Sequence, residues 1–539
     1  MAKPRITRRE FLRITGAGAV LGAGLSGCSI FQTGSSEPKE FDILIKNGWI
    51  LDGAGKAGYR GSVGIIGDKI AALGSLDRAA APQIIDAANL AVTPGFINIH
   101  GHTDGNLLTN PEGMSSVMQG VTLELGGQCG GSRGWNVGEY LDELESRQIG
   151  VNFATMVGHG TVRNAVLGST DRDPTSQELE QMRQMIDQAI QGGAVGLSTG
   201  LEYTPGNFSQ TPELIELARA LKPYQLPYAT HMRNEDRFLL EAVEEALTVG
   251  KQADCPVQIS HLKVLGKPNW HKIDPLFEML EIASRECGDV HFDRYPYTAY
   301  STGLSIIFPT WSKDGGDRRF LERLQDASLL PRLRTDVQVK IDQLQSWHAL
   351  MVTGLRHADD RKYIGWRVDD IARDKNNDPF DEAVALLLRN NGDVSTVGFG
   401  MDEENTRRIL SHPLGMIGSD GSAVPLEGGM VHPRSFGTFA RVLGYYCRQE
   451  KIFDLPAAVK KMTSMPAEKL KLDRRGKLEK GYYADIAIFD PATVIDTATY
   501  ENPRQFPLGV HHVLVNGKLT VQNGKHTGTL AGRPLRFKA

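Results

Sequence analysis

Cysteine is scarce in this chain, because its 539 residues include only five, scattered along the sequence. This spacing excludes the disulfide framework of small secreted domains. An excess of one charge is also missing, since 60 basic and 64 acidic residues leave a formal net charge of −4. Without a long basic stretch, the chain has no electrostatic case for a nucleic-acid partner. The length indicates several domains or one large barrel with additions.

A long hydrophobic run is absent too, and the most apolar stretch lies near the N-terminus. Residues 14–25 follow a basic region at 5–13 and are too few for a comfortable membrane span. Residues 7–13 resemble a twin-arginine export motif, and residues 25–28 resemble a bacterial lipobox ending at Cys28. We therefore expect residues 1–28 to be a signal peptide and Cys28 to be lipidated. The protein would be a membrane-anchored lipoprotein facing the periplasm or the cell exterior.

The remaining sequence divides into strand-rich ends and a long alternating middle. After a Ser/Gly/Pro/Glu spacer at 29–40, residues 41–93 and 468–539 contain short strand patterns separated by turns. We expect these two ends to form one β-sandwich domain. Residues 94–467 alternate apolar runs and amphipathic stretches about eight times, which predicts an α/β fold with a (β/α)₈ TIM-like barrel. The runs include residues 95–99, 152–157, 195–198, 227–230, 256–260, 291–293, 396–399 and 415–418.

Metal-binding side chains follow several of these apolar runs. The first run is followed by His100 and His102, whose alternate positions let both rings face one ion. A glycine loop carries Cys129, and two later runs end at His231 and His261. Each of these residues alone is more often structural, and a free Cys is usually a small buried residue. Together they lie where a barrel builds its active site, at the carboxyl ends of the strands.

This set of nitrogen and sulfur donors predicts a zinc-dependent hydrolase. The donors suffice for one or two ions, and zinc would activate water near neutral pH. Asp420 follows the last run and is our candidate for the general base and acid. No lysine stands at residues 197–200, the expected end of the fourth strand, where a carbamylated metal-bridging lysine would be expected, so Cys129 is the alternative candidate for that ligand role.

The motifs around these residues resemble the amidohydrolase superfamily and, within it, the N-acyl-D-amino-acid deacylases, or D-aminoacylases. The resemblance covers nearly the whole chain after residue 40. Its motifs are residues 94–104, the Cys129 loop, 200–203, 230–233, 259–263, 295–303, 418–421, 432–439 and 476–486. Two local departures are Gln128, where the family usually has Asn, and a longer segment between residues 420 and 434.

The resemblance implies roles for individual residues. Cys129, His231 and His261 would hold one zinc tightly. His100 and His102 would form a second, weaker position, with Cys129 as a bridge, and Asp420 would act as base and acid. The substrate α-carboxylate would be bound by Lys263, Tyr295, Ser301 and Arg434, with Tyr203 close to the scissile amide. Residues 311–370 would form an inserted lid over the site.

We therefore expect an exported zinc enzyme that splits N-acyl-D-amino acids into a carboxylate and a D-amino acid. Two other hypotheses stay open. One is a cyclic amidase of the hydantoinase or dihydropyrimidinase type, or a D-dipeptidase, on the same barrel. The other is an inactive, lipid-anchored binding protein.

Overall fold

The computed structural model describes residues 40–538. The expected signal peptide, Cys28 and nearly all of the spacer 29–40 lie outside the described residues. Among residues 40–538, no helix combines the length and the hydrophobicity that crossing a bilayer requires.

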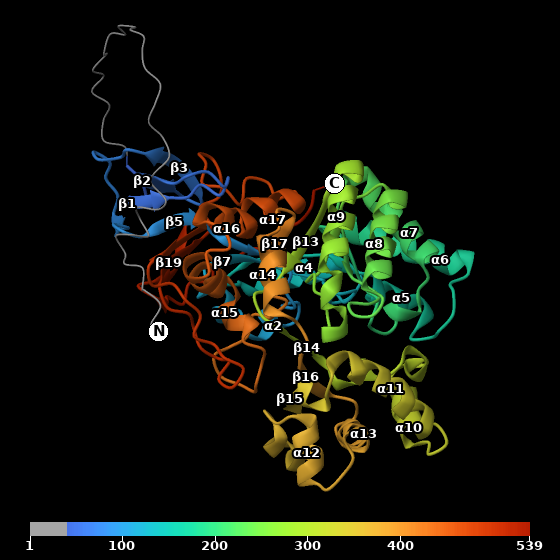
Figure 1. The fold of residues 1–539 in the computed structure, drawn as a ribbon. Helices are drawn as coiled ribbons and strands as arrows, with labels where there is room; N and C mark the ends of the chain where they lie inside the picture. The colour runs from blue at the N-terminus through green and yellow to red at the C-terminus, as the bar shows by residue number, and fades with distance from the viewer. Residues whose placement is uncertain (1–39, 539) are drawn as a thin grey trace.

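The two ends of the described chain meet in one nine-stranded sheet (Figure 1). The junction is an antiparallel pairing of β5 with β18, in which Val92 lies opposite Ile488. Apolar side chains from both ends share a buried core, for example Ile45, Val63 and Leu514. The expected β-sandwich built from both ends is thereby confirmed. Its strands are β1 (Ile43–Ile50), β2 (Tyr59–Ile66), β3 (Lys69–Gly74), β4 (Gln83–Asp86), β5 (Ala91–Pro94), β18 (Ile486–Phe489), β19 (Val510–Val515), β20 (Lys518–Gln522) and β21 (Lys525–His526).

The middle of the chain forms the predicted barrel of parallel strands. Two parallel sheets, β6-β7-β8 and β9-β10-β11-β12-β13-β17, are continuous through Met156, which separates β8 from β9. A parallel bridge between Gly101 and Gly421 closes the ring, so the first and last strands end side by side. The strands are β6 (Phe96–Asn98), β7 (Val121–Gly126), β8 (Asn152–Thr155), β9 (Val157–Gly158), β10 (Leu197–Gly200), β11 (Tyr228–His231), β12 (Val257–Ile259), β13 (Val290–Arg294) and β17 (Gly415–Ile417).

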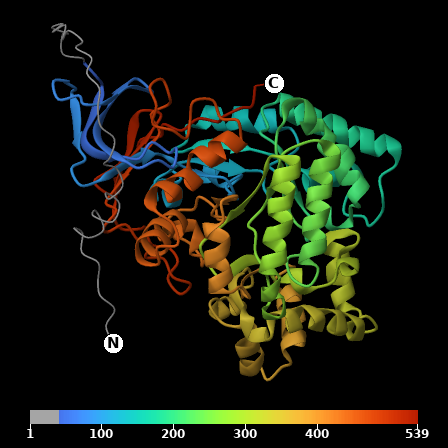
Figure 2. The same cartoon turned by 45° about the horizontal axis from the view of Figure 1, so that its top comes forward.

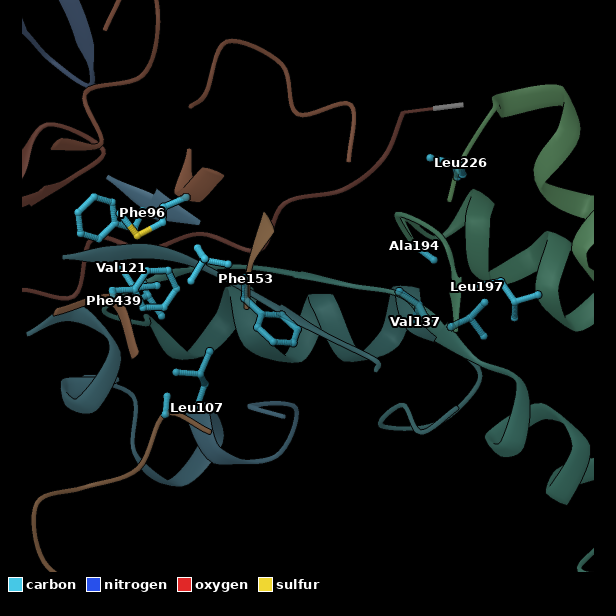
Figure 3. Packing of buried hydrophobic residues seen from close by; sticks show 14 of the residues in the cluster. Phe96, Leu107, Val121, Val137, Phe153, Ala194, Leu197, Leu226 and Phe439 are labelled. Carbon is cyan, nitrogen blue, oxygen red and sulfur yellow. The ribbon is translucent and has the colours of Figure 1, made fainter. Parts of the chain in front are cut away.

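Helices surround the barrel (Figures 1 and 2). Helix α6 begins with a capping box between Thr175 and Glu178 and buries Ile186 and Ile190. One buried cluster joins Phe96 and Phe153 of the strands to Phe439 of α15 (Figure 3). The helices are α2 (Asn106–Thr109), α3 (Met114–Val117), α4 (Val137–Arg147), α5 (His159–Leu167), α6 (Ser176–Gln191), α7 (Thr211–Ala218), α8 (Leu239–Ala253), α9 (Ile273–Cys287), α14 (Glu403–Ser411), α15 (Arg434–Arg441), α16 (Leu455–Met462) and α17 (Ser464–Lys469).

A separate body is inserted between β13 and β17, at one end of the barrel in both views (Figures 1 and 2). It has its own antiparallel sheet, β14-β16-β15, and its own hydrophobic cluster, which includes Phe320, Leu333 and Phe380. The segment 311–370 lies within this body. Its elements are β14 (Ala299–Gly303), α10 (Gly316–Gln325), α11 (Leu330–Leu344), β15 (Leu350–Leu355), α12 (Val368–Asp374), α13 (Pro379–Arg389) and β16 (Val394–Phe399).

The assignment of residues 396–399 to the barrel was wrong. These residues belong to β16, which pairs antiparallel with β14 and β15 rather than with a barrel strand. A short apolar run has the same local sequence pattern in a barrel strand and in an antiparallel strand. The sheet that it joins is decided by the strands with which it pairs.

Candidate metal centre

The predicted ligands come from neighbouring strands at one rim of the barrel. His231 is the last residue of β11, whereas His100 and His261 lie two residues beyond β6 and β12. Cys129 and Asp420 each lie three residues beyond their strands, β7 and β17. Because all these strands are parallel, their carboxyl ends meet at the same edge, which brings residues far apart in sequence together.

The side chains form a compact, largely buried cluster. Donor atoms of His100, Cys129, His261 and Asp420 all lie within 4.8 Å of one another. The Cys129 Sγ is 3.4 Å from His100 Nε2 and 3.5 Å from His261 Nε2. His231 joins through its Nδ1, which is 2.8 Å from His261 Nε2. His102 stands at the edge of this group, with Nε2 2.9 Å from Asp420 Oδ1.

Three members of the cluster have a left-handed backbone. The φ angles are +51° at Cys129, +36° at His261 and +50° at Asp420. Residues other than glycine seldom adopt this conformation, which costs of order 1–3 kcal/mol and concentrates at functional sites. The chain therefore accepts local strain at three of the positions whose donor atoms form the cluster.

Opposite charges hold Asp420 in its ionised form. Burial by itself raises the pKa of this carboxyl, but the charge of Arg434, together with the hydrogen bond to His102, holds it well below its usual value. The Arg434 guanidinium donates to Asp420 Oδ2 at 2.6 Å, while Asp420 Oδ1 faces His102 at 2.9 Å and His100 at 3.5 Å. A carboxylate in this state is available to accept a proton.

Three carboxylates that the sequence motifs did not single out support the histidines. Asp293, on β13, lies 3.0 Å from His100 Nδ1 and accepts the backbone N–H of His261 at 2.8 Å. Glu235 Oε1 lies 3.1 Å from His261 Nδ1, and Glu202 Oε2 lies 3.4 Å from His231 Nε2. The histidines were identified as metal-binding side chains at the carboxyl ends of predicted strands. The same criterion could have identified Asp293, because it is the fourth residue of the five-residue strand β13.

The expected substrate-binding residues lie around this cluster, and both cations already have acidic partners. Lys263 Nζ is 2.6 Å from Glu235 Oε1, and Arg434 is paired with Asp420. The Tyr203 ring packs 4.7 Å from the His231 ring, measured between centroids. Tyr295 is fully buried, lies beneath the Arg434 guanidinium, and its hydroxyl has no hydrogen-bond partner within residues 40–538.

A narrow cavity borders the cluster. The barrel and the inserted body both line this cavity. The barrel contributes Glu202, Tyr203, His231, Glu235, His261, Lys263, Leu265 and Asp420, and the inserted body contributes Tyr300, Ser301, Thr302, Ile306 and Lys340. A wider cavity adjoins it, because Glu202, Ile306 and Lys340 line both.

The donor set fits a zinc ion. Burial, followed by repulsion from Lys263, lowers the pKa of His261 to about 3, so its imidazole stays neutral, which is the form that binds metal. Burial and then Asp420 raise the pKa of the Cys129 thiol well above its usual value, so a thiolate there requires a compensating cation. Sulfur and imidazole donors around one point suit zinc better than a hard cation such as Mg²⁺.

Comparison with known proteins places this architecture in a family. The amidohydrolase family matches residues 83–273 and 390–521, and the unmatched stretch contains most of the inserted body. The D-aminoacylase of Alcaligenes xylosoxydans xylosoxydans is 36% identical over 522 residues, covering 93% of this chain and 98% of that protein.

Two solved structures agree with this assignment. A D-aminoacylase crystal structure, described as defining a novel subset of amidohydrolases, has a TM-score of 0.79 at 34% identity, covering 92% of this chain and 100% of the other. The N-acyl-D-glutamate deacylase of Bordetella bronchiseptica, complexed with zinc and a phosphonate inhibitor, has a TM-score of 0.79 at 30% identity, covering 93% of this chain and 100% of the other. The chain described here therefore belongs to the D-aminoacylase family of the amidohydrolase superfamily.

Proposed function

We propose that this protein is a zinc-dependent hydrolase that cleaves the amide bond of N-acyl-D-amino acids to give a carboxylate and a D-amino acid. The observation that carries the proposal is the buried cluster of His100, Cys129, His261 and Asp420, with His231 joined to it, beside a cavity that also contains Lys263. The similar D-aminoacylase and the zinc-bound N-acyl-D-glutamate deacylase support the same substrate class and metal.

The metal would be held by Cys129, His231 and His261, with His100 and His102 as a second, weaker position. Bound there, zinc would supply Lewis acidity to the acyl carbonyl and to water. Asp420 would accept the proton that water gives up and deliver it to the leaving nitrogen. Its carboxylate suits the first step because it is ionised before the reaction begins, and the proton that it gains there is the one that it would deliver in the second step.

Recognition of the amino-acid half would use the two cations of the site. An Arg fork and a Lys point charge are suited to an α-carboxylate. Arg434 and Lys263 are paired with Asp420 and Glu235, so a bound carboxylate would share or replace these contacts. The Tyr295 hydroxyl, which has no partner among the described residues, and Ser301 in the cavity wall would complete the carboxylate site, with Tyr203 near the amide.

A substrate screen with metal analysis on the same preparation tests the proposal. N-acyl derivatives of acidic, apolar and basic D-amino acids would be assayed beside their L-enantiomers, hydantoins and dihydropyrimidines. We expect release of D-amino acids only, by protein that contains about one tightly bound zinc. Turnover of the cyclic compounds alone would favour a cyclic amidase. Zinc and ligand binding without turnover of any compound would favour an inactive binding protein.

We also propose that the protein is exported by the twin-arginine route and anchored to the membrane through Cys28. The support is the order of the basic region, the apolar stretch and the lipobox-like residues 25–28 in the sequence. Replacing Arg8 and Arg9 together by Lys should leave the protein in the cytoplasm. Cys28→Ser should release exported protein from the membrane fraction. Undiminished export of the double Lys variant contradicts the proposed route.

A further inference from the structure

One lysine of the inserted body reaches into the barrel mouth. Lys340, on α11, places its Nζ 2.6 Å from Asp236 Oδ2 and 3.5 Å from Glu202 Oε1. The three side chains are largely withdrawn from solvent, with exposed fractions of 17% for Lys340, 12% for Glu202 and 5% for Asp236. Buried charges persist where they are paired, so this contact fixes the lysine and both carboxylates together.

The second oxygen of Glu202 faces a candidate metal ligand. Glu202 Oε2 is 3.4 Å from His231 Nε2, whereas the Nδ1 of the same ring points to His261 Nε2 at 2.8 Å. Glu235 Oε2 is 3.9 Å from His231 Nε2, too far for a hydrogen bond, and Glu235 already contacts Lys263. Glu202 is therefore the carboxylate that accepts the Nε2–H of His231.

A carboxylate at this position selects the ring state that binds metal. When Nε2 keeps its proton and donates it to Glu202, the lone pair of Nδ1 is left pointing into the cluster. The same contact fixes the orientation of the ring and increases the basicity of the nitrogen that binds the metal. Changing such supporting partners in metalloproteins costs about 10- to 100-fold in metal affinity or activity.

We propose that Lys340 and Glu202 are positioning residues that connect the inserted body to the metal centre. Lys340 holds the Glu202 carboxylate in place, and Glu202 in turn sets the tautomer and orientation of His231. The inserted body thereby completes the metal site as well as lining the cavity. This inference rests on the proposed zinc site, but it does not depend on which substrate the enzyme cleaves.

Zinc affinity tests the proposal without an activity assay. Purified wild type, Glu202→Gln, Lys340→Met and Lys340→Arg would compete for zinc with a chromogenic chelator. We expect Glu202→Gln and Lys340→Met to bind zinc about tenfold more weakly, and Lys340→Arg, which keeps the charge, to stay within about threefold of wild type. Lys362→Met is the matched control, because Lys362 belongs to the same inserted body, is exposed, and forms no ion pair with a carboxylate among residues 40–538.

Thermal unfolding of the metal-free proteins separates positioning from folding. If Lys340→Met is unstable, Glu202→Gln carries the test, because it keeps the size of the side chain and its contact with Lys340. Wild-type zinc affinity in both Glu202→Gln and Lys340→Met would overturn the inference. A wild type that binds zinc but releases no D-amino acid contradicts the proposed function alone. A wild type that binds no zinc contradicts both.

Discussion

Asp420 has a different partner on each of its two oxygens. Arg434 donates to Oδ2, and His102 lies 2.9 Å from Oδ1, so the carboxylate is oriented toward the cluster before any substrate binds. The same residue has a left-handed backbone, at φ +50°. This combination of orientation, ionisation and strain is the physical basis for assigning it the proton transfers.

Asp420→Asn should therefore lower kcat/KM about 10³-fold, because asparagine keeps the shape of the side chain but cannot carry the proton. The zinc content should remain near that of wild type, since the proposed tight ligands are unchanged. Steady-state kinetics and metal analysis would be compared with Asp473→Asn, an exposed carboxylate on the surface. Wild-type kcat/KM in Asp420→Asn would exclude Asp420 as the base.

Glu124, on β7, is a buried acid whose charge depends on pH. Burial raises its pKa from 4.5 to about 7, although Ser116, Asn98 and Thr103 donate hydrogen bonds that oppose the shift. Asn98 Nδ2 also lies 2.8 Å from Ser419 Oγ, which connects Glu124 to the Asp420 loop.

The raised pKa has a defined effect on stability. The stabilisation from the neutral carboxyl is complete below pH 4.5 and is lost as pH rises through about 7, where the folded protein must ionise a buried acid. Glu124→Gln cannot ionise, so relative to wild type it should gain up to about 3 kcal/mol between pH 5 and pH 8.5. Thermal unfolding of both proteins across this range tests the effect. A constant difference in Tm would contradict it.

The inserted body behaves as an element with its own core. Helix α11 buries Leu333, Val337, Ile341 and Leu344 inside it, while Lys340 on the same helix points to Glu202 and Asp236. Packing within the inserted body therefore determines where Lys340 and the cavity wall lie. Damage to that packing should reach the active site without unfolding the barrel, whose hydrophobic cluster is separate.

Leu333→Ala should destabilise the inserted body by about 2–5 kcal/mol, because Leu333 is fully buried and its loss leaves a cavity. We expect faster proteolytic cleavage within residues 299–399 and a lower kcat/KM, while the barrel remains resistant. The control is Gln338→Ala, an exposed position on the same helix. If cleavage begins in the barrel instead, the inserted body does not unfold independently.

At the scale of the whole molecule, the C-terminal segment links the barrel to the nine-stranded sheet. The Gly532 N–H donates to Ile149 O at 2.7 Å, Leu535 N–H to Phe153 O at 2.7 Å, and Phe537 N–H to Gly193 O at 3.0 Å. These contacts join residues more than 300 positions apart. Phe153 lies in β8, Ile149 precedes β8, and Gly193 precedes β10. The contacts therefore lie toward the amino-terminal ends of these strands, away from the metal ligands at their carboxyl ends.

Deleting residues 530–539 should destabilise the whole protein by about 3 kcal/mol or more, because each lost hydrogen bond contributes about 1 kcal/mol and the apolar surface of Leu535 and Phe537 is lost as well. A shorter deletion of residues 538–539 removes none of the three bonds and serves as the control. Chemical denaturation of the two truncated proteins measures the difference. Equal stability would mean that the C-terminal segment is dispensable.

The sequence by itself determined the barrel, the β-sandwich built from both ends of the chain, and the positions of the candidate ligands. These follow from local patterns, because the periodicity of a strand and the residues that come directly after it lie within a few positions of each other in the sequence. Tertiary structure decided the rest. It assigned residues 396–399 to the inserted body, brought Asp293 and Glu235 behind the histidines, and placed Lys340 against Glu202 across 138 positions. Such contacts depend on how separate elements pack, and no local pattern encodes the distance between them.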